Sequence, residues 1–249
     1  MSIGEIIEID RPESWPTDLT TYLQAIAATV PEDVTDGQDL PDKADLAAQD
    51  DGLRELLAGR ALRTFHATRL LDYEASGIRA SGLRILTESL VEDRQDKALA
   101  EGVITPEEHL ALRNSSVFKA GKMTSYRVGK VCLAGNARPL HEHPSGFWHQ
   151  LSSWGGEAQY MTGAWKLLNS QRVKELGQPA IVVTLVDASN PKIAVVPGHE
   201  LIYAFVASYR GMTRVGSQID FEADIPGSRI EDIWQPGRSE YDQFELLPR

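Results

Sequence analysis

The sequence has a single cysteine, Cys132, among its 249 residues. An intramolecular disulfide needs two cysteines and a thiolate zinc cluster needs several, so neither can stabilise this chain. The chain also has no run of the roughly 20 apolar residues that a membrane-spanning helix needs. Its first ten residues lack the basic end and apolar core of a signal peptide. These absences predict a cytoplasmic protein with no membrane partner.

The sequence also has few positive charges relative to negative ones, and its net charge is −11. Residues 1–55 contain 14 Asp and Glu against 3 Lys and Arg, whereas residues 56–249 contain 22 of each sign. Without a net positive field to gather phosphates, the chain is not a general binder of nucleic acid or of anionic membranes. The imbalance predicts a boundary near residue 55, between an acidic N-terminal segment with a short helix and linker, residues 1–55, and one domain, residues 56–249.

The apolar pattern of residues 56–249 mixes the periods of strands and helices, which predicts an α+β domain. Residues 180–186 are β-branched and apolar on both faces, as in a central strand. A strand ending at His66 precedes a helix from Asp72 to Ser81, which Gly82 closes. Residues 201–209 fit a strand or a helix. The remaining expected elements are a helix over 19–30, a loop or mobile linker over 31–51, helices over 87–101, from 105 and over 145–154, and strands over 126–134, 192–196 and 218–225.

The order is a strand, the His-x-Thr of Phe65-His66-Ala67-Thr68, a helix and then Gly82-Leu83. This order resembles the opening of the ADP-ribosyltransferase fold, which poly(ADP-ribose) polymerases and many bacterial toxins share. In order of elements the resemblance covers residues 60–235. Residues 127–134 look like the family's second motif strand, with Cys132 nearest the position of its tyrosine. Residues 218–233 look like the late strand and turn that carry its glutamate. The resemblance implies mixed sheets with helices of the ADP-ribosyltransferase type.

The resemblance also implies a function and a substrate. We expect NAD-dependent ADP-ribosyl transfer to a macromolecular target, a protein or a nucleic acid, or NAD glycohydrolysis, with NAD as the substrate. His66 is then a catalytic residue that binds the nicotinamide-side ribose, and Thr68 helps to hold NAD. Arg69, or Arg63, has the planar fork that suits the pyrophosphate. The aromatic side chain that faces nicotinamide could be Tyr126, Trp154 or Tyr160.

Cleavage of the N-glycosidic bond of NAD builds positive charge at the ribose carbon, so the reaction needs a nearby carboxylate. Glu222 lies on the polar face of the expected late strand, together with Asp220. Glu157 follows two glycines and precedes Tyr160 by three positions, which suits an acid on a flexible hinge beside an aromatic ring. The sequence leaves the choice between Glu157 and Glu222 open.

Two other functions remain open at this point. His141, His143 and His149 could surround one divalent ion, which indicates a metal-dependent enzyme similar to the cupins. Cys132 at the expected tyrosine position instead favours a non-catalytic binding module with a degenerate transferase fold. The acidic N-terminal segment motivates a further hypothesis, in which residues 31–51 cover the basic side of the site in cis.

Overall fold

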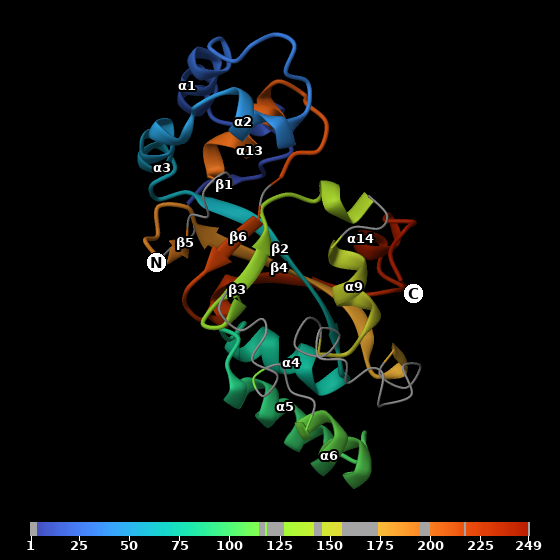
Figure 1. Cartoon of the computed structure of the whole chain (residues 1–249). Helices are drawn as coiled ribbons and strands as arrows, with labels where there is room; N and C mark the ends of the chain where they lie inside the picture. Colours follow the sequence, from blue (N-terminus) through green and yellow to red (C-terminus); the bar gives the residue numbers. More distant parts are fainter. Residues whose placement is uncertain are drawn as a thin grey trace. The chain divides into compact units, whose positions relative to one another are not determined.

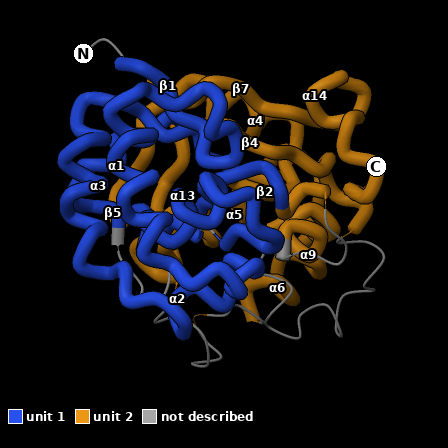
Figure 2. Tube along the Cα trace, turned by 90° about the horizontal axis from the view of Figure 1, so that it is seen from above, with its two compact units in different colours: residues 1–65, 132–138, 184–221 blue, residues 66–131, 139–183, 222–249 orange. Residues whose placement is uncertain are grey.

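The computed structural model describes residues 4–114, 118, 127–141, 146–155, 174–194, 200–216 and 218–248. Helices and strands are mixed along these residues, as the sequence predicts. The chain forms two compact units, coloured separately in Figure 2. Unit 1 comprises residues 1–65, 132–138 and 184–221, and unit 2 comprises residues 66–131, 139–183 and 222–249. This division differs from the expected boundary near residue 55, because residues far along the chain return to complete unit 1.

The described strands form one mixed sheet, in which β2 and β4 each contribute residues to both units. The strand order is β5-β6-β3-β2-β4-β7, and β1 pairs with β2 in parallel. Strand β2 pairs antiparallel with β3, with Phe65 opposite Ala134, and β5 pairs antiparallel with β6. The bounds are β1 Ile6–Ile7, β2 Ala61–Leu70, β3 Val131–Ala134, β4 Gln178–Asp187, β5 Ile193–Ala194, β6 Gln218–Phe221 and β7 Ile230–Trp234.

Unit 1 is organised around helix α13 (Leu201–Tyr209), which is buried from Leu201 to Ser208. A helix that is apolar all round is stable only when other elements enclose it, and α13 contacts α1, α2 and α3 (Figure 1). These helices comprise α1 (Thr17–Ala27), α2 (Leu40–Lys43) and α3 (Asp50–Leu56), and short 3-10 turns cover Pro12–Ser14, Gly37–Asp39 and Ala47–Gln49. The structure therefore makes residues 201–209 a helix.

Residues 31–51, which the sequence predicts as a loop or mobile linker, contain α2 and two 3-10 turns between irregular stretches. Two of the acidic side chains in this segment bind partners within unit 1. Asp50 is 5% exposed, accepts a hydrogen bond from the Ile202 backbone N–H at 2.9 Å and pairs with Arg54 at 2.7 Å. Asp36 accepts from the Nε of Arg214 at 2.6 Å. Ile202 and Arg214 lie far away in sequence, so composition alone could not reveal these contacts.

Unit 2 contains the helices whose ends the sequence marks most clearly. They are α4 (Asp72–Ser81), α5 (Glu88–Ala100), α6 (Pro106–Asn114), α9 (Gly146–Ser152) and α14 (Ser239–Asp242), with 3-10 turns over Arg138–His141 and Gly227–Arg229. Thr87 caps α5 by accepting from the Leu90 backbone N–H at 3.0 Å. Thr105 and Glu108 form a reciprocal capping box at the start of α6. The expected helices over 72–81 and 87–101 and from 105 are confirmed.

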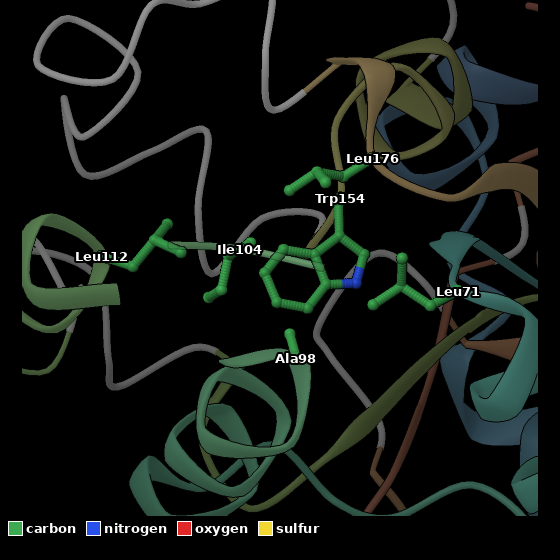
Figure 3. Packing of buried hydrophobic residues seen from close by; sticks show 6 residues of the cluster. All are labelled: Leu71, Ala98, Ile104, Leu112, Trp154 and Leu176. Carbon is green, nitrogen blue, oxygen red and sulfur yellow. The ribbon is translucent and has the colours of Figure 1, made fainter. Parts of the chain in front are cut away.

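An apolar cluster joins α5 and α6 to the segments around Trp154 and Leu176. Trp154 is 1% exposed. Figure 3 shows its indole between Leu71 on one side and Ile104 and Leu112 on the other, with Ala98 of α5 beside it. In the described part of the chain, no helix has both the length and the apolar character needed to cross a membrane.

Candidate functional site

A cavity of about 320 Å³ lies within unit 2, at the end of β2. Small-molecule sites span roughly 300–1,000 Å³, so the cavity has the size of a small site or of part of a larger one. Its walls come from β2, from α4, from the residues that follow α4, and from α5. The lining residues are His66, Thr68, Leu70, Tyr73, Glu74, Gly77, Ile78, Ser81, Gly82, Leu83, Arg84, Leu90, Asp93, Arg94 and Lys97.

Strand β2 places His66, Thr68 and Leu70 in one wall of the cavity. Side chains two apart on a strand point to the same face, which explains why these three residues share the wall. Thr68 is 7% exposed, and its hydroxyl has no hydrogen-bond partner among the described residues. Thr68 lines the cavity, so its hydroxyl is available to a ligand there. The structure thus brings two predicted NAD contacts together.

The end of α4 completes this wall through a glycine at which a side chain would clash with the neighbouring backbone. Gly82 has φ +94°, and a Cβ atom there would lie 1.8 Å from the carbonyl oxygen of Ile225. Leu83 follows and pairs with Ile225 through two backbone hydrogen bonds of 2.8 Å. The Gly82-Leu83 pair that the sequence singles out therefore fixes where α4 ends and places Leu83 against the cavity.

Glu74 anchors the start of α4 beneath the cavity. Its carboxylate accepts hydrogen bonds from the Leu71 backbone N–H at 2.9 Å, from Trp154 Nε1 at 3.0 Å and from Arg94 Nε at 2.6 Å. Burial raises the pKa of Glu74, but the Arg94 guanidinium and these donors outweigh burial and hold the pKa below its ordinary value. Glu74 is therefore an ionised structural carboxylate with its acceptor oxygens occupied.

Arg94 and its neighbours on α5 were not singled out in the sequence, although they also line the cavity. Arg94 also lies over the Trp154 ring, 5.3 Å from its centroid. Arg84 pairs with Asp93 at 3.2 Å, and the Lys97 ammonium lies 4.4 Å from the centroid of the Tyr73 ring. Helix α5 reads as an ordinary charged helix in the sequence, and only its packing beside α4 brings these side chains to the cavity.

Other predicted site residues do not line the cavity. Arg69 is 9% exposed, and its guanidinium donates to the carbonyl oxygens of Leu176 at 2.7 Å and Leu151 at 3.3 Å. Burial lowers the pKa of Arg69. Trp154 lies in the apolar cluster of Figure 3, so it presents no open face to a ligand there. The expected pyrophosphate contact at Arg69 and the aromatic plate at Trp154 therefore belong to the scaffold of unit 2.

Of the two predicted acids, Glu222 is not brought to the cavity. The side chain of Glu222 is 49% exposed and lies 3.9 Å from the Lys130 ammonium. Glu222 is absent from the cavity lining. Glu157 and Tyr160 lie outside the described residues. The acids that do line the cavity are Glu74 and Asp93, and both are ion-paired.

The described residues do not assemble the histidine cluster of the metal-enzyme alternative. Over the described ranges, no group of three His, Cys, Asp or Glu side chains is arranged to hold a metal ion. His141 packs edge-on against Phe244, with ring centroids 4.7 Å apart, and His149 packs against Trp148 at 5.7 Å. His143 lies outside the described residues.

Fold and cavity together define the class of the protein as a mixed α/β protein with a ligand-sized cavity in one of its two units. The chain matches no family model, no curated protein and no solved structure. Its function therefore has to be inferred from the chemistry of the cavity.

Proposed function

We propose that the cavity beside His66 binds NAD and that the protein cleaves the N-glycosidic bond of NAD, passing ADP-ribose to a macromolecular target or to water. One observation carries this proposal. A single cavity is lined by His66, Thr68 and Gly82-Leu83, which are the parts of the sequence that resemble the opening of the ADP-ribosyltransferase fold. These parts are up to 17 residues apart in the chain. Their meeting in one cavity supports a common role in binding a ligand.

The lining residues suit a sugar beside a flat ring. A neutral imidazole donates from one nitrogen and accepts at the other, so His66 can bind a ribose hydroxyl in either sense. The free Thr68 hydroxyl supplies a second contact to the same sugar. Leu70, Ile78 and Leu83 provide apolar surface for a ring. In this proposal the pocket positions the ribose, and the developing positive charge at its reacting carbon needs a carboxylate nearby.

We assign the catalytic carboxylate to Glu157 in preference to Glu222. Glu74 already accepts hydrogen bonds from four donors and Asp93 is held by Arg84, so neither lining acid is available. Glu222 stands outside the cavity lining and beside an ammonium group. Glu157 follows Gly155, which has φ +86°, and the chain can bend sharply at such a glycine.

Nicotinamide release from NAD, measured on the full chain, tests the proposal together with calorimetric titration of NAD. We expect Glu157→Gln to lower the rate of release about 100-fold or more with little change in NAD affinity, because the carboxylate acts mainly in the transition state. His66→Ala and Thr68→Val should weaken NAD binding. Glu222→Gln should leave both quantities unchanged.

His109→Ala is a matched control for His66→Ala, because His109 lies in unit 2 but outside the cavity lining and contacts Asp96 at 2.7 Å. Wild-type protein that neither binds NAD nor releases nicotinamide would refute the proposal. NAD binding without release, unaffected by Glu157→Gln, would instead identify a non-catalytic binding module.

A further inference from the structure

Among the described residues, the charges that line the cavity do not cancel. The cations are Arg84, Arg94 and Lys97, and the acids are Glu74 and Asp93. Arg94 is neutralised by Glu74 at 2.6 Å and Arg84 by Asp93 at 3.2 Å. No carboxylate lies within ion-pair distance of Lys97 in the described part of the chain. The cavity therefore keeps one positive charge that the lining acids leave unbalanced.

The Lys97 ammonium is also held in a defined place. Asp93 and Glu101 lie one helical turn away on either side, where a lysine commonly forms an ion pair. Asp93 instead pairs with Arg84, and Lys97 extends over the ring of Tyr73, which contributes its face from α4 at 4.4 Å. A cation above an aromatic ring gains about 0.5–1 kcal/mol at an exposed site. Tyr73 thus fixes the ammonium at the cavity without neutralising its charge.

We propose that Lys97 is the anion-binding residue of the cavity and that the ligand presents a phosphate group to it. The same cavity supplies His66 and Thr68 for hydroxyl groups and apolar side chains for a ring, so the ligand class is a small phosphate-bearing molecule such as a nucleotide. This inference rests on the proposed function where the phosphate is part of the NAD pyrophosphate. Lys97 takes the place of Arg69 as the expected pyrophosphate contact, because the Arg69 guanidinium is bound to backbone carbonyls.

Calorimetric titrations of the full chain with ADP-ribose, inorganic pyrophosphate and nicotinamide test the assignment. Lys97→Met keeps most of the side chain's length and removes its charge. We expect this variant to bind ADP-ribose and pyrophosphate at least about tenfold more weakly, because a charge-assisted contact is lost, and to bind nicotinamide as the wild type does. Lys97→Arg should retain most of the affinity. Raising the salt concentration should weaken ADP-ribose binding to the wild type more than to Lys97→Met.

Lys130→Met is the matched control, because Lys130 lies in unit 2 beside Glu222 and outside the cavity lining. The inference is overturned if Lys97→Met binds ADP-ribose and pyrophosphate like the wild type, if it weakens nicotinamide equally, or if the wild type binds neither phosphate compound. Lys97-dependent pyrophosphate binding without nicotinamide release would leave the inference standing and remove the proposed function. Nicotinamide release with an unchanged KM for NAD in Lys97→Met would support the proposed function and remove the inference about Lys97.

Discussion

Tyr73 carries a buried hydroxyl oxygen that has no hydrogen-bond partner among the described residues. Burial, together with the nearby Glu74 carboxylate, raises the pKa of Tyr73 to about 12, so the phenol is neutral at physiological pH. A buried polar group without a partner loses its contact with water and gains nothing in return. The ring of Tyr73 is therefore useful to the site as a support for Lys97, and its hydroxyl is a cost to folding.

Replacing Tyr73 by Phe should stabilise the protein by up to about 1 kcal/mol, because the ring stays and the unpaired hydroxyl is removed. The midpoint of urea unfolding measures this change, with the slope of the transition expected to stay constant. Tyr22→Phe is the matched control, because the Tyr22 hydroxyl donates to the Gln49 carbonyl oxygen at 2.8 Å, and that variant should lose about 1 kcal/mol. A loss of equal size in Tyr73→Phe would mean that the Tyr73 hydroxyl is paired in solution.

Helix α4 connects the strand that carries His66 to the turn that carries Leu83. Glu74 fixes its first turn by accepting from the Leu71 backbone N–H, and Gly82 ends it. A Cβ atom at Gly82 would meet the backbone of residues 225–227, and a Cβ atom at Gly227 would lie 2.6 Å from the carbonyl oxygen of Ala80. The length and direction of α4 are therefore set at both ends, and with them the width of the cavity.

Gly82→Ala should destabilise the protein by more than about 1 kcal/mol, because a left-handed φ is unfavourable for alanine and its Cβ would clash with the backbone of Ile225. Gly77→Ala on the same helix should instead stabilise it by about 0.5–1 kcal/mol, since nothing lies within 4 Å of a Cβ atom there. Thermal unfolding of both variants measures the contrast. Equal effects at the two positions would show that the approach to Ile225 is not tight in solution.

At the scale of the whole molecule, the acidic N-terminal residues are part of a compact unit. Trp15 packs on Phe205 with ring centroids 5.1 Å apart, and Leu19 and Leu23 are fully buried. Helices α1 and α3 contact α13, which lies near the other end of the chain. The segment therefore cannot be removed without exposing the apolar surface of α13.

Deleting residues 1–55 should abolish cooperative unfolding of unit 1 and lead to aggregation, because α13 loses the helices that cover it. Near-ultraviolet circular dichroism and light scattering measure both effects. A soluble, folded deletion variant would contradict the packing of α13.

The hypothesis that residues 31–51 cover the basic side of the site is tested by a variant that removes acidic charge without unfolding unit 1. Glu32, Asp33 and Asp39 are exposed, so changing them to Gln or Asn together should leave the unfolding midpoint within about 0.5 kcal/mol of the wild type. Faster nicotinamide release in this triple variant would support the covering hypothesis, and an unchanged rate would exclude it.

The sequence by itself determined the elements whose signals are local. Helix α4 has the predicted bounds because Gly82 marks its end, and α5 and α6 begin at threonine caps. The spacing of His66 and Thr68 is also local, but the sequence predicted that the strand ends at His66. Strand β2 continues to Leu70 and so puts both residues in one wall of the cavity. These features depend on residues within a few positions of one another.

Only the tertiary structure decided the features that join distant residues. Trp154 donates to the Glu74 carboxylate across 80 residues, and Arg69 donates to the Leu176 carbonyl across 107. Both side chains therefore stabilise unit 2, although each is of a type that can bind a ligand. Residues 201–209 became a helix because three other helices enclose them. Lys97 reached the cavity because α5 packs near the end of β2. Propensity and periodicity describe a residue's own neighbourhood, whereas burial and charge pairing depend on partners that only folding supplies.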